Sequence, residues 1–220
     1  MKFIDLTVTL DKNASIFKDP KYFPPELTFL YTPDIDYMGV RYSGHLKMHL
    51  HTGSHLDTPK HFGGKSGLNE AKLDVLCGEC IIIKLPVLMS GPVTVEMVEN
   101  RIPLGMETKG KRLLLMCGYN NAHWSKSDYY ENTAFVSPEL AQWIVDKGFV
   151  LVGLDMLTDG LEGSPCHRIF LNNGVYIAEC LTNYYEVPDD LTTAILIVAP
   201  IPLRDMEASP IRAFLIDDRE

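Results

Sequence analysis

The sequence predicts a sheet-rich α/β domain, and three observations support this prediction. Short apolar runs bounded by Gly or Pro recur along the whole chain. Such runs are typical of buried strands. Helix signals are fewer and are clear in only two segments. No repeat, low-complexity tract or linker divides the 220 residues, so we expect one domain spanning residues 1–220.

The expected strands are compact apolar segments, several of them rich in β-branched residues. The first begins two residues from the start of the chain, and the last lies about twenty residues before its end. They are Phe3–Leu10, Cys80–Leu85, Arg112–Cys117, Phe149–Leu154, Val175–Ala178 and Ala194–Ala199.

The clearest helix begins at Ser137, a good N-cap, followed by Pro138 at the first helical position. Gly148 can end it. A second, weaker helix is expected over Thr94–Asn100. Four prolines in Ser15–Pro33 favour an ordered loop there.

The composition excludes some classes of partner. The net charge is −9 and the pI about 5.2, which argues against nucleic acid or anionic membrane as the main partner. An apolar content of 46% with 22% charged residues is typical of a soluble protein, and small-molecule substrates are favoured. Asp5 interrupts the first apolar run, so no secretory leader is expected, and we predict a cytoplasmic protein.

Five of the seven histidines fall between positions 45 and 61, and the densest stretch holds His51, His55, Asp57 and His61. Imidazoles and a carboxylate are common ligands of catalytic zinc or manganese. A straight strand would separate positions 51 and 57 by about 20 Å. We therefore expect a bend at Gly53, at a strand end that enters a tight turn or short helix. The alternative is a set of hydrogen-bonded histidines on a polar face.

His45 and His49 share strand parity with His51, and a supporting or packing role is favoured for both. Further ligands should come from elsewhere in the chain. His167 follows a loop-like Gly-Ser-Pro-Cys segment, and Glu179 ends an apolar strand-like run. A strand that delivers a carboxylate to its tip suits a metal site, although an exposed strand-end glutamate would look the same.

The stretch His51–Phe62 resembles the H-x-G-[ST]-H-x-D-x-P-x-H-F signature of the cyclase family of metal-dependent hydrolases. That family includes bacterial-type kynurenine formamidases and isatin hydrolases. The resemblance plausibly covers the whole chain, because three other segments look like family landmarks. They are Asp5-Leu6, Gly153–Asp155 and Ile211–Leu215.

The resemblance implies a role for each candidate residue. In formamidases the signature's first two histidines and its aspartate bind metal, its last histidine is the acid/base, and a later histidine and glutamate twelve residues apart complete a dinuclear site. The matching residues here are the metal ligands His51, His55, Asp57, His167 and Glu179, with His61 as the catalytic acid/base. The implied fold has a central barrel-like mixed sheet flanked by helices, usually in a homodimer or homotetramer.

Two departures concern the substrate pocket. Formamidases carry a tryptophan followed by proline in the N-terminal loop, where this chain has Phe17 and Lys18. They also show Thr-Pro-Ser where this chain has Met156-Leu157-Thr158. Phe17 is therefore the expected substrate-binding residue, in a pocket that differs from the formamidase pattern.

The expected activity is hydrolysis of a small-molecule amide bond, such as that of N-formylkynurenine, by a metal-bound hydroxide with His61 moving protons. One or two divalent ions are expected, zinc first and manganese second. The first alternative is an enzyme that opens a cyclic amide, imide or lactone. The second is a non-catalytic metal-binding protein.

Overall fold

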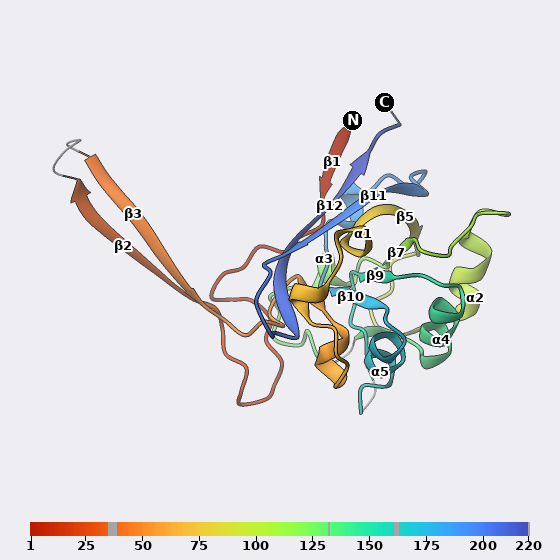
Figure 1. The fold of residues 1–220 in the computed structure, drawn as a ribbon, viewed down its shortest axis with the longest axis horizontal. Helices are drawn as coiled ribbons and strands as arrows, with labels where there is room; N and C mark the ends of the chain where they lie inside the picture. Colours follow the sequence, from red (N-terminus) through yellow and green to blue (C-terminus); the bar gives the residue numbers. More distant parts are fainter. Residues whose placement is uncertain (35–38, 132, 161–162, 220) are drawn as a thin grey trace.

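The computed structural model describes the chain except residues 35–38, 132, 161–162 and 220. Its centre is an eight-stranded sheet in the order β1-β12-β11-β5-β7-β9-β10-β4, and an additional β12–β4 pairing closes seven of these strands into a barrel (Figure 1). The strands are β1 Lys2–Asp5, β4 His55–Asp57, β5 Cys77–Lys84, β7 Arg112–Met116, β9 Leu151–Leu154, β10 Tyr176–Glu179, β11 Thr193–Pro200 and β12 Ala208–Asp217.

The barrel is mixed in direction, as the resemblance predicted. Strands β5, β7, β9 and β10 run parallel to one another, whereas β11, β12 and β4 complete the circle through antiparallel pairs. All six strand segments expected from the sequence contribute to this sheet, although β1 ends at Asp5. Strand β12 was not predicted as a strand.

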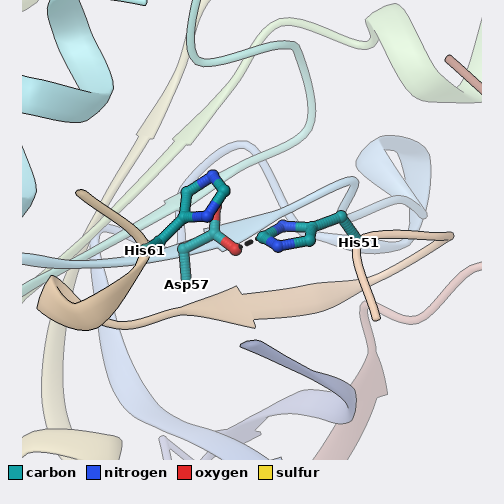
Figure 2. A group of neighbouring side chains, drawn as sticks. All are labelled: His51, Asp57 and His61. Atoms are coloured by element: carbon teal, nitrogen blue, oxygen red, sulfur yellow. Dashed lines mark ion pairs between the residues drawn. The ribbon is translucent and has the colours of Figure 1, made fainter. Parts of the chain in front are cut away.

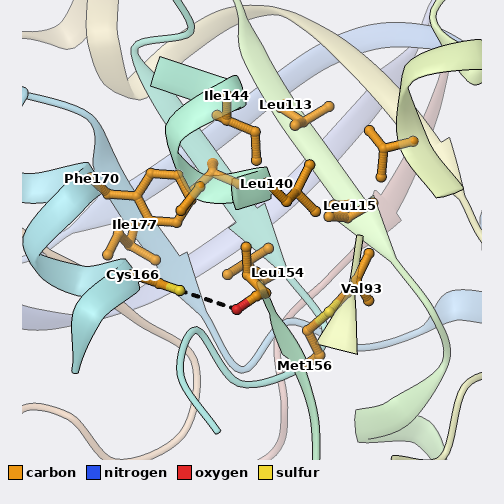
Figure 3. Close-up of a cluster of buried hydrophobic side chains, with 14 of the residues drawn as sticks. Val93, Leu113, Leu115, Leu140, Ile144, Leu154, Met156, Cys166, Phe170 and Ile177 are labelled. Carbon is orange, nitrogen blue, oxygen red and sulfur yellow. Dashed lines mark hydrogen bonds between the residues drawn. The ribbon is translucent and has the colours of Figure 1, made fainter. Parts of the chain in front are cut away.

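Apolar runs form these strands because both faces of the sheet are covered. In β7, Leu113 and Leu115 point outward into a core shared with the helices, and Leu114 and Met116 point into the barrel. Figure 3 shows the outer core, where Leu113 and Leu115 lie among helix residues such as Ile144. A run buried on both sides must be continuously apolar, which explains the sequence pattern.

Helices cover the outer face of the parallel strands. Helix α4 spans Pro138–Asp146, and the Ser137 Oγ accepts a hydrogen bond from the Leu140 N–H, as the sequence predicted. The second expected helix is divided into α2, Val95–Val98, and a 3-10 turn, Glu99–Arg101. None of the described helices is long and apolar enough to cross a membrane.

The remaining elements are short. Strands β6 and β8 form a parallel pair, and the others are single helical turns that connect the strands. They are β6 Gly91–Val93, β8 Ala134–Val136, α1 Leu73–Leu76, α3 Tyr119–His123, and 3-10 turns at Pro59–Phe62, Leu68–Glu70 and Tyr184–Glu186.

The prediction of a loop over Ser15–Pro33 is wrong for the second half of this segment. Strand β2, Glu26–Asp34, pairs antiparallel with β3, Gly39–Lys47, and the two form an arm that projects from the barrel (Figure 1). Alternating Leu27 and Phe29 are a strand signal that the prolines obscured. A two-stranded ribbon has only edge strands, so Pro33 is tolerated in it.

Candidate metal centre and cavity

A sharp change of chain direction brings the first ligand candidates together. Gly53 has φ +71°, a conformation that side chains disfavour, and it lies between His51 and strand β4. His55 and Asp57 are two residues apart on β4 and therefore share one face. The 3-10 turn Pro59–Phe62 then returns His61 toward them. The expected bend at Gly53 and the short helix after the strand are both confirmed.

Two neighbouring elements supply the distant candidates. Glu179, at the end of β10, lies directly opposite His55 in the β10–β4 register. His167 lies in the first turn of helix α5, Pro165–Asn172, which begins within the segment expected to be a loop. The sequence Ser164-Pro165 matches Ser137-Pro138 at the start of α4. This match is the signal that could have predicted the start of α5.

The six polar candidates converge around the Asp57 carboxylate. Its Oδ1 lies 2.8 Å from His51 Nδ1 and 3.4 Å from His55 Nε2, and its Oδ2 lies 3.4 Å from His167 Nε2. His55 Nε2 is also 3.4 Å from Glu179 Oε2. Figure 2 shows His51 directed at Asp57 with His61 beside the pair. The side chains predicted from residues 51 to 179 therefore meet in one place.

Three buried atoms of this cluster lack hydrogen bonds among the described residues. They are His55 Nε2 and both oxygens of Asp57, because the 2.8 Å approach of His51 lacks hydrogen-bond geometry. His55 Nδ1 faces the Gly53 carbonyl at 2.8 Å, so Nδ1 carries a proton and Nε2, which faces the carboxylates, is the nitrogen available to a metal ion. Unpaired buried carboxylate oxygens are costly. A divalent cation would satisfy all three atoms, so the residues present fit a metal.

The electrostatics lead to the same conclusion. Burial alone would raise the pKa of Asp57, but His55 and His51 hold it well below its usual range. Burial would lower the pKa of His55 and His167, but the carboxylates around them raise the former well above its usual range and the latter to about 10. The site therefore stabilises positive charge, which a bound ion supplies.

The ligand atoms fall into two groups that share one residue. His51, Asp57 and His61 form the first, and His55, Asp57 and Glu179 the second, with ligand atoms within 4.8 Å of one another in each. Because Asp57 belongs to both groups, the site has candidate ligands for either one ion or two. The same grouping leaves two roles open to His61, those of ligand and acid/base.

His61 differs from the other histidines in its environment. It is half-buried, its ring centroid lies 4.3 Å from that of His51, and burial lowers its pKa to about 4. The imidazole is therefore neutral near pH 7 and can accept a proton. Its position at the edge of the candidate metal ligands fits a general base.

Two acidic residues that the sequence analysis missed support the ligands. Asp159 Oδ2 contacts His167 Nδ1 at 2.5 Å, and its carboxylate also accepts the N–H groups of Cys166 and His167 at the start of α5. Asp159 thus caps the helix and directs His167 Nε2 toward Asp57. Glu207 Oε1 lies 3.4 Å from His51 Nε2. Neither residue belongs to the 51–62 signature, so only spatial proximity reveals them.

Asp159→Asn is expected to weaken metal binding by about 10–100-fold, the usual effect of losing a carboxylate that orients a histidine ligand. The measurement is the metal dissociation constant by competition with a chelator. Asp146→Asn, on the exposed end of α4, is the matched control and should bind as the wild type does. Equal affinities in the two variants would contradict an orienting role for Asp159.

A cavity of about 230 Å³ opens above these residues and has an aromatic wall. Phe17 lines it, with its ring centroid 5.6 Å from that of Tyr22 and 5.4 Å from that of Tyr130. The expected substrate-binding residue thus lies at the mouth of the cavity. Residues 156–158 differ from the Thr-Pro-Ser of formamidases. Of these, Leu157 lines the cavity, whereas Met156 is buried in the outer core.

Comparison with known proteins identifies the family of this chain. A family model described as "Putative cyclase" matches residues 4–158, which include the signature and β9. The chain belongs to the cyclase family. It shares 30% identity over 178 residues with a kynurenine formamidase of Bacillus mycoides (strain KBAB4), covering 78% of each chain. A Bacillus cereus kynurenine formamidase is 27% identical over 220 residues, covering 97% of each chain.

Solved structures of other proteins have the same fold as this chain. Isatin hydrolase A from Labrenzia aggregata, bound to benzyl benzoate, superposes with a TM-score of 0.81 at 19% identity, covering 97% of this chain and 93% of that one. An isatin hydrolase bound to the product analogue thioisatinate gives 0.81 at 18% identity, with 99% and 93% covered. The overall fold is therefore common to this chain and these structures.

Proposed function

We propose that this chain is a metal-dependent hydrolase that cleaves a carbon–nitrogen bond in a small aromatic amide, with an aryl formamide such as N-formylkynurenine as the first candidate. The observation that carries the proposal is a set of buried candidate ligand atoms, beside an aromatic-lined cavity, that lack hydrogen bonds among the described residues. The formamidases that the chain resembles over 78% or more of its length support the same substrate class.

The residues have separable roles in this reaction. A divalent ion held by His51, His55, Asp57, His167 and Glu179 would lower the pKa of water and polarise the amide carbonyl. His61, neutral near pH 7, accepts the proton of the attacking water and passes it to the leaving nitrogen. Phe17, Tyr22 and Tyr130 pack against the aromatic part of the substrate and hold its carbonyl near the ligands.

The remaining assignments belong to the same proposal. Zinc is the first candidate metal and manganese the second, because His, Asp and Glu ligands suit both. The two ligand groups that share Asp57 favour two ions. An aryl-formamide substrate would place the protein in tryptophan catabolism, and we propose a cytoplasmic enzyme that acts on a small molecule.

A cyclic amide such as isatin is the second candidate substrate. Phe17 stands where formamidases have tryptophan, so the aromatic side chain at this position of the cavity wall is smaller than the one the resemblance predicts. The chemistry would be unchanged, because water again attacks a carbonyl bound to nitrogen. Hydrolysis of a formamide releases two separate products, whereas opening of a cyclic amide gives a single product.

The deciding experiment measures turnover of N-formylkynurenine, isatin and a simple lactone by one preparation whose zinc and manganese contents are also measured. We expect hydrolysis of the formamide that scales with metal content and is removed by chelation. Preferential opening of isatin would select the second candidate. Metal-loaded protein inactive on every substrate would support a non-catalytic metal-binding protein.

A further inference from the structure

A second cavity, of about 600 Å³, lies against the one above the metal centre. Four of the described residues line both cavities and form a shared wall, and they are Phe17, Tyr130, Leu157 and Asp159. We call the cavity that the metal ligands line the inner cavity and the second one the outer cavity. At about 230 Å³ the inner cavity is smaller than the roughly 300–1,000 Å³ of common ligand pockets. A substrate larger than a small aromatic amide would therefore extend into the outer cavity.

The two cavities differ in the chemistry of their walls. The inner cavity has the aromatic wall and the metal ligands. Ser90, Glu131 and Thr133 line the outer cavity and not the inner one. Among the described residues that line either cavity, Glu131 is the one charged side chain that belongs neither to the metal cluster nor to its supporting Asp159. The pair of cavities therefore suits a substrate with an aromatic amide at one end and a charged group at the other.

Lys18 supplies the opposite charge beside the outer cavity. Its Nζ forms an ion pair with Glu131 Oε1, and the side chains of Lys18 and Glu131 are 64% and 57% exposed. An ion pair exposed to this degree contributes little to folding stability, because water solvates both charges and screens their attraction. The two groups can therefore exchange their mutual contact for contacts with a charged ligand at little cost to the fold.

Hydrogen bonds hold the backbone segments from which both side chains extend. The Glu131 N–H donates to the Asp128 carbonyl at 2.9 Å, which closes a turn. The Ser125 N–H donates to Ser15 Oγ at 2.9 Å, and this contact joins the segment that carries Glu131 to the segment that carries Lys18. Binding a ligand between the two charges would therefore order side chains and leave these backbone segments in place, which limits its entropic cost.

We propose that the outer cavity is a subsite for an α-amino-acid group of the substrate, in which Glu131 binds the ammonium and Lys18 the carboxylate. The inference rests on the proposed hydrolysis of an aryl amide, whose ring and amide would occupy the inner cavity. An α-amino acid carries both charges on one carbon, so it can contact both members of the ion pair at once. A substrate with only one of these charges would leave one member of the pair without a partner.

Lys18 is one of the positions at which this chain departs from the formamidase pattern. Formamidases have proline after the aromatic residue of the N-terminal loop, and proline has no charged group to offer a substrate. The pair of Lys18 and Glu131 is therefore a feature of this chain that the resemblance does not imply. The departure and the outer cavity point to the same part of the substrate, because Phe17, the neighbour of Lys18, belongs to the shared wall.

The test compares two substrates that differ only in this group. N-formylkynurenine carries the amino-acid group, and ortho-formamidoacetophenone has the same aryl formamide and ketone without it. We expect metal-loaded wild type to prefer N-formylkynurenine by roughly 100-fold in kcat/KM, mainly through KM, or about tenfold for each charged contact. Glu131→Gln and Lys18→Met should each lower this preference about tenfold. Asp128→Asn and Lys126→Met, exposed residues of the neighbouring segment, are the matched controls and should keep it.

A reversal of charge gives a result that a structural defect would not produce. Glu131→Lys places two cations beside the outer cavity. This variant should prefer the deaminated analogue of N-formylkynurenine, which keeps the carboxylate and lacks the ammonium, whereas the wild type should prefer N-formylkynurenine itself. An unchanged order of preference in Glu131→Lys would overturn the proposal.

Binding of the amine products separates this inference from the proposed function. Titration calorimetry of metal-loaded protein with kynurenine and with ortho-aminoacetophenone requires no turnover, and kynurenine should bind the wild type about tenfold or more tightly. Hydrolysis of both formamides without preference, together with equal binding of both amines, would overturn the subsite and leave the proposed function standing. No hydrolysis of either formamide, with tighter binding of kynurenine that Glu131→Gln and Lys18→Met weaken, would overturn the proposed function and support the subsite.

Discussion

Asp57→Asn is expected to abolish tight metal binding and, with it, all metal-dependent turnover. Asp57 is fully buried, and its two oxygens face ligand atoms of three histidines. The amide has one acceptor oxygen and no charge, so it can neither bridge two ions nor balance the charge of one. Metal content and turnover of the same preparation check the expectation, with the exposed Asp74→Asn on α1 as the control.

Thermal unfolding separates this effect from a folding defect. Metal at 100 times its dissociation constant should stabilise the wild type by about 2.7 kcal/mol and leave the melting temperature of Asp57→Asn unchanged. Without metal the variant should be less stable than the wild type, because His55 and His51, which hold the pKa of Asp57 well below its usual range, lose their carboxylate partner. A variant that binds metal with wild-type affinity would contradict the central position of Asp57.

His61→Ala is expected to lower kcat by roughly 10²–10⁴-fold while the metal content stays at the wild-type value. The reason is that His61 is a neutral, half-buried imidazole at the edge of the ligand cluster, suited to proton transfer. Steady-state kinetics with metal analysis measure both quantities. His45→Ala, on strand β3 of the arm, is the control and should leave both unchanged.

The metal analysis also decides between the two roles that the geometry allows. His61 offers a ligand atom to the group of His51 and Asp57. If His61→Ala lost an ion together with activity, His61 would be a ligand, and the proton would have to move through another group. Full metal occupancy and normal turnover together would exclude both roles.

The sequence predicts the parts of the site that are local. His51, His55, Asp57 and His61 occur within eleven residues, and the bend at Gly53 follows from the need to gather them. The strands were predictable because those buried on both faces are continuously apolar. The pairing of Glu179 with His55 is harder to predict from the sequence, because it depends on a β10–β4 register between residues more than a hundred positions apart.

Asp159, the β2–β3 arm and the closure of the barrel became evident only from the three-dimensional structure. Asp159 reaches His167 only because α5 begins where it does, and that helix start was interpreted as a loop. The arm was missed because four prolines outweighed the alternation of Leu27 and Phe29. Closure of the barrel depends on the N-terminal end of β12 pairing with β4, and three residue pairs leave little pattern in a sequence.

In this site the candidate metal ligands and the aromatic residues of the cavity wall belong to different kinds of structural element. His55 and Asp57 belong to β4, which pairs with β10 on one side and β12 on the other, and Glu179 ends β10 opposite His55. Phe17, Tyr22 and Tyr130 belong to connecting segments outside the barrel. Mutations in those connections can therefore retune which molecule is accepted while the hydrolytic apparatus persists, so one catalytic scaffold can diversify toward new substrates by small evolutionary steps.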